Sequence, residues 1–128
     1  MNAGDTFLIE EPGTSLDSHL WIVLSDPDID PHSVLLVNFT SFREDKDQAC
    51  IVDPHEHGYL SKKSCVNYQK AKVVGVVDLD NLLTNKLIKK HDPLSAELLQ
   101  KIRDGASNSK YIEFGAWEML ASQGLVPE

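Results

Sequence analysis

The chain lacks the features that mark several large protein classes. No apolar run approaches the ~20 residues that a membrane-spanning helix needs, so we expect no membrane partner. The first residues have no basic start and no long apolar stretch, so we expect no signal peptide. Only two cysteines are present, which predicts reduced thiols in a cytoplasmic protein. A glycine-rich phosphate loop, a dinucleotide fingerprint, a nucleophile elbow and a CxxC pair are all missing, and we expect no cofactor.

What is present is an ordinary globular composition with an uneven charge. The 128 residues are 41% hydrophobic and 25% charged, which is typical of one soluble domain. The net charge of −8 argues against broad, charge-driven binding to nucleic acid. Along the chain, however, residues 1–56 carry −10, residues 57–103 carry +5 and residues 104–128 carry −3. The basic stretch 57–103 is compatible with a nucleic-acid groove and equally with solvated lysines on unrelated faces.

Hydrophobic alternation predicts strands first, and helical spacing appears only later. Short apolar runs rich in β-branched and aromatic residues, bounded by turn-forming residues, are typical of strands. Leucines three to four residues apart are typical of a helix face. The predicted strands are 5–11, 19–25, 33–42, 49–53 and 64–77, with a bulge at Gly75, and the predicted helices are 79–90, 93–104 and 109–123.

Several local signals refine these boundaries. Residues 43–48 are polar and indicate a hairpin-type connection. Asp92 and Pro93 favour an N-cap followed by the first helical position. Gly105 and Gly124 are expected to end the second and third helices. Residues 110–114 alternate and are also compatible with a strand.

Strands grouped ahead of helices predict an α+β fold. We expect a single domain over residues 1–128, with a small curled antiparallel sheet in residues 1–78 and two or three C-terminal helices in residues 79–128. Because the polar residues beside the strong strands lie at strand ends, we expect some of them to converge on one cleft.

Four of those polar residues are candidates for catalysis. His19 opens the second strand, Thr40 and Ser41 close the third, and His57 follows the fourth. Two histidines can divide general acid and general base work near neutral pH, and a hydroxyl can stabilise charge that develops on a phosphate oxygen. This set suits the metal-independent cleavage of RNA, in which the neighbouring 2′-hydroxyl is the nucleophile.

Four further residues, Lys62, Lys63, Ser64 and Tyr68, are candidates for substrate binding. The lysines open the basic stretch, and Tyr68 lies among polar neighbours, where it can stack on a base. A half-buried strand tyrosine is the alternative for Tyr68. A structural zinc site is an alternative for a different group, made of His55, His57, Cys50 and Cys65, although their spacing matches no standard zinc pattern.

The order of these short motifs resembles the PemK/MazF-like toxins, the ribonucleases of bacterial toxin–antitoxin modules. The resemblance covers residues 4–78. It begins at Gly4-Asp5-Thr6-Phe7, continues through the Ile22-Val23-Leu24-Ser25 strand and a strand ending in Asn38-Phe39-Thr40-Ser41, and ends with a strand that carries Ser64-Cys65-Val66 and runs into Lys72-Val73-Val74. It implies an SH3-like barrel with appended helices, a homodimer, single-stranded RNA as substrate, an antitoxin protein as partner and no metal. Thr40 and Ser41 match one position that carries the chemistry. Where the family has an Arg-Pro pair, this chain has His19-Leu20.

Replacing an arginine by a histidine exchanges a permanent positive charge for one that depends on pH. The resemblance therefore leaves two functions open. One is a variant endoribonuclease that uses His19 and His57. The other is a non-catalytic barrel that binds a protein partner, with the acidic residues 1–56 facing a basic surface. A small metal-binding structural protein is a third alternative.

Overall fold

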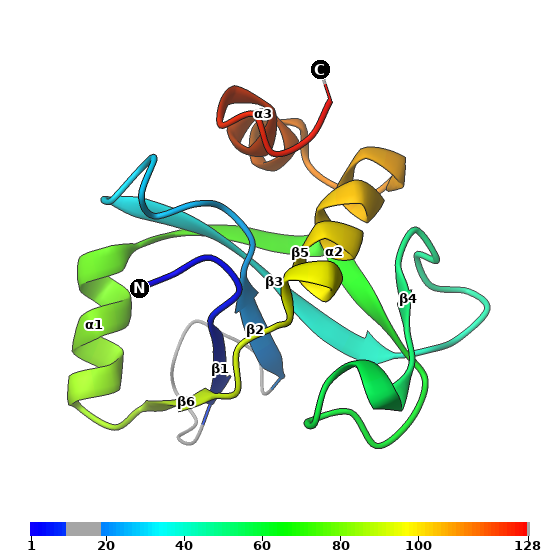
Figure 1. Cartoon of the computed structure of the whole chain (residues 1–128), viewed down its shortest axis with the longest axis horizontal. Coiled ribbons are helices and arrows are strands. Elements are labelled where there is room, and N and C mark those ends of the chain that lie inside the picture. Colours follow the sequence, from blue (N-terminus) through cyan, green and yellow to red (C-terminus); the bar gives the residue numbers. More distant parts are fainter. Residues whose placement is uncertain (10–18, 128) are drawn as a thin grey trace.

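A computed structural model describes residues 1–9 and 19–127 of the chain. The fold is α+β: a curled, six-stranded antiparallel half-barrel with three helices, the last two at the C-terminal end (Figure 1). The strand order along the sheet is β4-β5-β3-β2-β1-β6. The strands are β1 (Thr6–Ile9), β2 (Leu20–Val23), β3 (Ser33–Ser41), β4 (Ile51–Val52), β5 (Ser64–Gly75) and β6 (Ile88–His91), and the helices are α1 (Val76–Thr84), α2 (Ala96–Asn108) and α3 (Phe114–Ser122).

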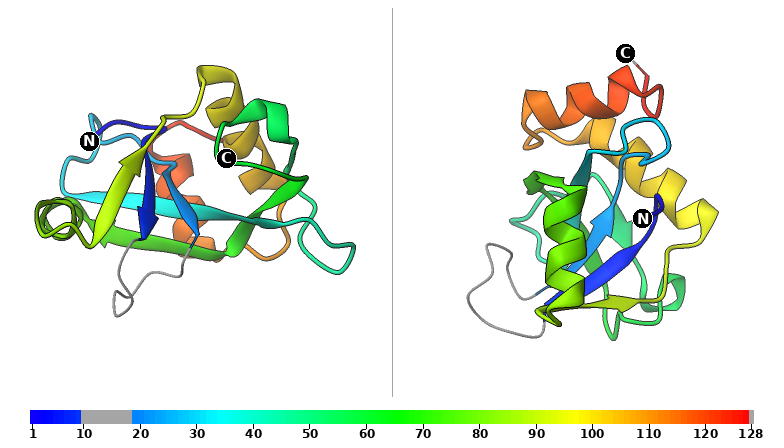
Figure 2. Two further views of the ribbon diagram at one scale, coloured as in Figure 1. Left: turned by 90° about the horizontal axis from the view of Figure 1, so that it is seen from below. Right: turned by 90° about the vertical axis from the view of Figure 1, so that its left-hand side faces the viewer.

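The predicted fold class is confirmed, and the alternation along β3 explains how the sheet is covered. Successive side chains of a strand point to opposite faces. Leu35, Val37 and Phe39 pack in a core with α2 and α3. Val34 and Leu36 pack in a second core with Leu79 of α1 and Ile88 of β6. The sheet is therefore covered on both faces, and α1 lies apart from α2 and α3 in every view (Figures 1 and 2).

The predicted helix over 79–90 is wrong in its second half, because the chain leaves the helix at Asn85 and forms β6. Lys86 takes a left-handed conformation, with a φ of 58°, and Leu87 N–H donates to the Leu82 carbonyl at 2.9 Å. This is a Schellman-type ending, in which the left-handed position is usually a glycine. β6 then pairs antiparallel with β1 and covers an edge that would otherwise be unpaired.

The predicted stop at Gly105 is also wrong. Helix α2 starts after Ser95, whose Oγ accepts a hydrogen bond from Leu98 N–H at 3.1 Å, and continues through Gly105 to Asn108. Gly105 lies inside the helix and faces Tyr68 and Cys50, so closely that a Cβ atom at this position would clash with both residues. A glycine is needed there for the close approach of α2 to the sheet, and the helix does not end at it.

Three smaller differences concern the connections. Residues 43–48 do not form a hairpin turn, because β5 lies between β3 and β4 in the sheet. The predicted bulge at Gly75 is wrong, because Gly75 is the N-cap of α1. The register of β3 and β5 shifts instead between Leu36 and Asn38. The third helix starts at Phe114 and not at residue 109, and residues 110–114 form no strand. Gly124, with a φ of 72°, follows the end of this helix as predicted.

Residues 10 and 11 of the predicted first strand lie outside the described residues. Within residues 1–9 and 19–127, no helix has both the length and the apolar character needed to cross a membrane.

Candidate functional site

Three strands bring their ends together around one open cavity of about 300 Å³, which we call the His19 cavity. The antiparallel register explains this convergence. Trp21 lies opposite Asn38, so continuing the register places His19 beside Thr40. Thr40 and Ser41 in turn lie opposite Cys65 and Ser64. The residues that line the His19 cavity are His19, Phe39, Thr40, Ser41, Tyr59, Leu60, Ser61, Lys62 and Ser64.

Most of the residues predicted from the sequence meet here. The cavity is lined by His19, by the hydroxyl-bearing residues Thr40, Ser41 and Ser64, and by Lys62. Ser64 is buried and its hydroxyl donates to the Lys62 carbonyl at 3.1 Å, which connects the start of β5 to the preceding loop. Together these groups offer one proton acceptor, several neutral hydrogen-bond donors and one positive charge.

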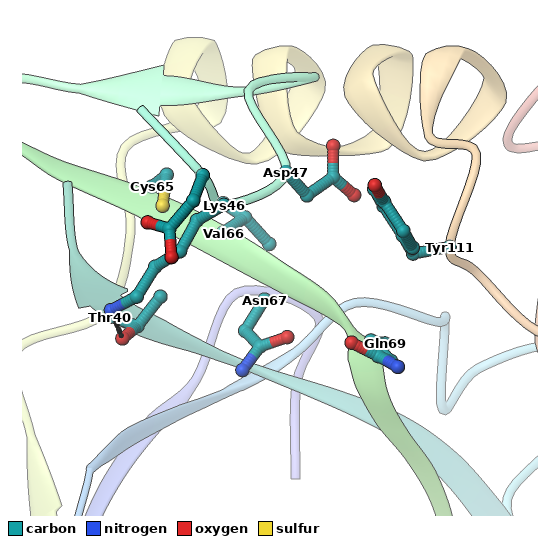
Figure 3. A pocket seen from close by; sticks show the side chains of 9 residues that line it. Thr40, Lys46, Asp47, Cys65, Val66, Asn67, Gln69 and Tyr111 are labelled. Carbon is teal, nitrogen blue, oxygen red and sulfur yellow. Dashed lines mark hydrogen bonds between the residues drawn. The ribbon is translucent and has the colours of Figure 1, made fainter. Parts of the chain in front are cut away.

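Thr40 has a partner that the sequence analysis missed. Lys46 Nζ donates to Thr40 Oγ1 at 2.8 Å (Figure 3). It also donates to the Ser41 carbonyl at 2.9 Å. These bonds place a positive charge directly beside the end of β3. The signal in the sequence was the short distance from Thr40 to Lys46, because a polar connection of this length turns back over the strand that it leaves.

His57 does not line the His19 cavity, although it lies close behind it. The ring is 6% exposed, and its centroid lies 6.4 Å from that of Phe39, which does line the cavity. Its Nε2 is 2.8 Å from the Asp92 carbonyl, and its Nδ1 accepts from Tyr59 N–H at 3.1 Å. The neutral tautomer with a proton on Nε2 fits both contacts. His57 therefore ties the loop before β5 to the end of β6.

Two of the four predicted substrate-binding residues also lie elsewhere. Tyr68 is fully buried, its hydroxyl donates to the Ile102 carbonyl at 2.6 Å, and burial raises the pKa of the phenol strongly. Its side chain belongs to the contact between β5 and α2. Lys63 is exposed and its Nζ lies 4.1 Å from the centroid of the Phe42 ring. Lys62 and Ser64 are the two that line the cavity.

A second cavity of about 260 Å³ adjoins the first and shares Thr40 with it (Figure 3). It lies along β5 from Cys65 to Gln69, mostly beyond the two residues, Ser64 and Cys65, that pair with β4. The sequence analysis did not predict it, because its walls come from three segments that are distant in the chain. We call it the Asn67 cavity, and its lining residues are Thr40, Asp45, Lys46, Asp47, Cys65, Val66, Asn67, Gln69 and Tyr111.

The residues considered for a zinc site do not assemble into one. Both ring nitrogens of His57 are used in the fold, as described above. Cys50 and Cys65 are buried free thiols, and burial raises the pKa of Cys50 to about 11 and also raises that of Cys65. Across residues 1–9 and 19–127, no group of three or more His, Cys, Asp or Glu side chains is placed to hold a metal ion.

A comparison of the sequence with models of known protein families and with curated protein sequences finds no match. The residues themselves must therefore support any assignment of function.

Proposed function

We propose that the protein is an endoribonuclease of the PemK/MazF-like type, which cleaves single-stranded RNA at the His19 cavity without a metal ion. The observation that supports this most directly is that five candidate residues from three separate segments line one cavity: His19, Thr40, Ser41, Lys62 and Ser64. A histidine can supply the general base for this reaction, and hydroxyl and ammonium groups can stabilise the charge that develops on the phosphate.

In the proposed reaction, the 2′-hydroxyl of one nucleotide attacks the phosphorus that follows it. His19 takes the proton of that hydroxyl as general base. The bond from phosphorus to the 5′ oxygen breaks, and the leaving oxygen takes a proton from water. The products are a 2′,3′-cyclic phosphate and a 5′-hydroxyl. The hydroxyls of Thr40 and Ser41 and the ammonium of Lys62 donate hydrogen bonds to the phosphate oxygens as their charge increases.

The arrangement supports a mechanism with one histidine in the cavity. Because both nitrogens of the His57 ring are bonded within the fold, His57 holds the cavity wall, and we assign it a positioning role. His19 occupies the position at which the resemblance expects an arginine.

The test is cleavage of a single-stranded RNA in EDTA by the wild type and two histidine variants. His19→Ala should lower the cleavage rate about 100-fold or more, which is the usual contribution of a general base. His55→Ala is the matched control, because His55 is exposed and does not line the cavity. It should cleave at the wild-type rate. A wild type that cuts no RNA between pH 5 and pH 8, or a fully active His19→Ala, would overturn the proposal.

A non-catalytic module that binds a protein partner is the second candidate, and one observation favours it. Among the described residues that line the His19 cavity, Lys62 is the single lysine or arginine. A nuclease site usually neutralises more phosphate charge than one ammonium can. A stable complex with a protein partner, formed by a chain that never cleaves RNA, would support this candidate over the first.

The same resemblance leads us to propose a cytoplasmic homodimer with an antitoxin protein as its partner. Light scattering on the purified chain tests whether it is a homodimer. A mass of twice 14.3 kDa at micromolar concentration is expected, and a monomer at every concentration would refute it. Loss of RNA cleavage when the protein encoded by a neighbouring reading frame is added would support an antitoxin partner.

A further inference from the structure

The Asn67 cavity has the chemistry of a nucleobase site. Asn67 and Gln69 each present an amide, which offers a hydrogen-bond donor and an acceptor side by side. Nucleobases present the same combination along their edges, and amide side chains are common readers of it. Tyr111, which is 55% exposed, gives the cavity an aromatic wall on which a base can stack (Figure 3).

A third amide lies directly beside Asn67. Asn38 is opposite Asn67 in the register of β3 and β5, and side chains at opposite positions share a face of the sheet. Asn38 is fully buried, and within residues 1–9 and 19–127 neither its Nδ2 nor its Oδ1 has a hydrogen-bond partner. Buried polar groups are nearly always paired, so the unpaired Asn38 amide adds unused hydrogen-bonding capacity beside Asn67, although Asn38 does not itself line the cavity.

The carboxylates of the cavity are already engaged. Asp45 accepts two hydrogen bonds from Arg43, at 3.0 and 2.7 Å. Asp47 accepts from Ala49 N–H at 3.0 Å and from the Ser109 hydroxyl at 2.5 Å. Lys46 is also engaged, through its bonds to Thr40 Oγ1 and the Ser41 carbonyl. The groups left to select a ligand are mainly the amides and the tyrosine, which suits a flat, hydrogen-bonding ligand.

The wall that carries Tyr111 is held in place by one hydroxyl. Ser109 Oγ donates to Asp47 and also accepts from the backbone N–H groups of Tyr111 and Ile112, at 3.1 and 3.2 Å. The loop before α3 is thus joined to the loop after β3. An exposed aromatic ring on a loop fixed in this way loses little conformational freedom when a base stacks on it.

The position of the cavity relates it to the proposed reaction. Thr40 lines both cavities, and Lys46, which binds Thr40 Oγ1, lines the Asn67 cavity. We propose that the Asn67 cavity binds one base of the RNA, stacked on Tyr111 and read by the Asn67 and Gln69 amides, while the neighbouring phosphate occupies the His19 cavity. This inference rests on the proposed ribonuclease function, because it assigns the base that determines where the chain is cut.

The first experiment determines the base preference of cleavage by sequencing the ends of RNA fragments. The wild type should favour one base at one position beside the cut. Gln69→Ala should reduce that preference by lowering kcat/KM for the best sequence about ten-fold, because one amide contact to the preferred base is lost. Tyr111→Ala should raise KM about ten-fold with little change in kcat, and Tyr111→Phe should restore it, because the phenyl ring still stacks.

A matched control is Phe114→Ala. Phe114 is also an exposed aromatic residue, 68% exposed, but it does not line the cavity. Its removal should change neither KM nor base preference. If RNA is cleaved but the preference and KM are the same in wild type, Gln69→Ala and Tyr111→Ala, the base site is refuted and the ribonuclease proposal is retained.

If the wild type cleaves no RNA, the ribonuclease proposal fails and binding decides the inference. The probes are four single-stranded homopolymer oligonucleotides of A, C, G or U, labelled for fluorescence anisotropy. Binding that favours one base at least ten-fold and is lost in Tyr111→Ala supports the base site. Binding that is independent of the base, or absent for all four, overturns it.

Discussion

Replacing Gly105 by alanine tests the reassignment of Tyr68 from substrate binding to packing. Gly105 lies inside α2 and is buried against β5 and the segment before β4. A methyl group at this position would lie 2.8 Å from Cys50 Cβ and 3.1 Å from the Ala49 carbonyl oxygen, and it would overlap the Tyr68 hydroxyl. Carbon atoms prefer separations of about 3.5–4.0 Å, so the helix or its neighbours must move.

The expected change in the free energy of unfolding is the sum of one stabilising and two destabilising effects. Alanine favours a helix over glycine by about 1 kcal/mol. Overpacking of a tight core costs about 1–3 kcal/mol, and the upper part applies here because backbone and Cβ atoms cannot rotate away. Displacement of the Tyr68 hydroxyl also weakens its 2.6 Å bond to the Ile102 carbonyl, at a cost of about 1 kcal/mol. We expect Gly105→Ala to lower the free energy of unfolding by about 2–3 kcal/mol.

The assay is urea denaturation of a double-mutant cycle with Tyr68→Phe. Tyr68→Phe alone should cost about 1 kcal/mol, the worth of a typical buried hydrogen bond. In the Gly105→Ala background it also removes the oxygen that overlaps the new methyl group. The double variant should therefore be at least about 1 kcal/mol more stable than the sum of the single changes predicts. Additivity within about 0.5 kcal/mol, or an unchanged stability of Gly105→Ala, would refute the packing argument.

Three further predictions concern other parts of the molecule. The thiols of Cys50 and Cys65 should react with a disulfide reagent at pH 8 only as fast as the protein unfolds, since both are buried and have raised pKa values. Rapid labelling of the native protein would contradict this. Because the folded pKa of Cys50 is about 11 against 9.0 for a free thiol, the folded state holds the proton more tightly, and urea titrations should show stability falling as pH rises from 9.0 towards 11. His57→Ala should lower the free energy of unfolding by about 2 kcal/mol, through two lost hydrogen bonds of about 1 kcal/mol each, whereas equal midpoints in urea would remove its positioning role.

The parts of the fold that were predictable are those set by local patterns. The alternation in residues 33–42 and 64–77 gave the two longest strands, and the glycine at 124 marked a helix end. The grouping of His19, Thr40 and Ser41 was predictable because antiparallel strands bring the start of one beside the end of the next.

The parts that were missed depend on contacts between distant residues. Strand β6 has a weak pattern of its own, and it forms because the edge of β1 needs a partner. The role of Gly105 depends on Tyr68, and that of His57 on the Asp92 carbonyl, 35 residues away. The wall that Tyr111 gives to the Asn67 cavity depends on the bonds of Ser109 to Asp47 and to the Tyr111 backbone, 62 and 2 residues away in the chain. Nothing within a short window of sequence records these pairings.

The placement of the lysines predicts how RNA binding should depend on salt. The basic stretch 57–103 is spread over several elements: Lys70 and Lys72 lie on β5 and Lys89 and Lys90 on β6, and the sheet order places β3, β2 and β1 between these two strands. Other cations of the stretch are tied to the protein, Lys101 to Glu56 at 3.0 Å and Arg103 to the Leu24 carbonyl at 3.0 Å. Of the lysines and arginines in the described part of the chain, Lys62 and Lys46 are the ones that line the two proposed cavities. Each phosphate contact with single-stranded nucleic acid contributes about −0.7 to the slope of log K against log salt, so an oligonucleotide titrated between 50 and 300 mM salt should give a slope of about −1 to −2. A slope of about −4 or steeper would show that more cations face the RNA than this chain gathers at its cavities, and base contacts would then contribute less of the affinity than we propose.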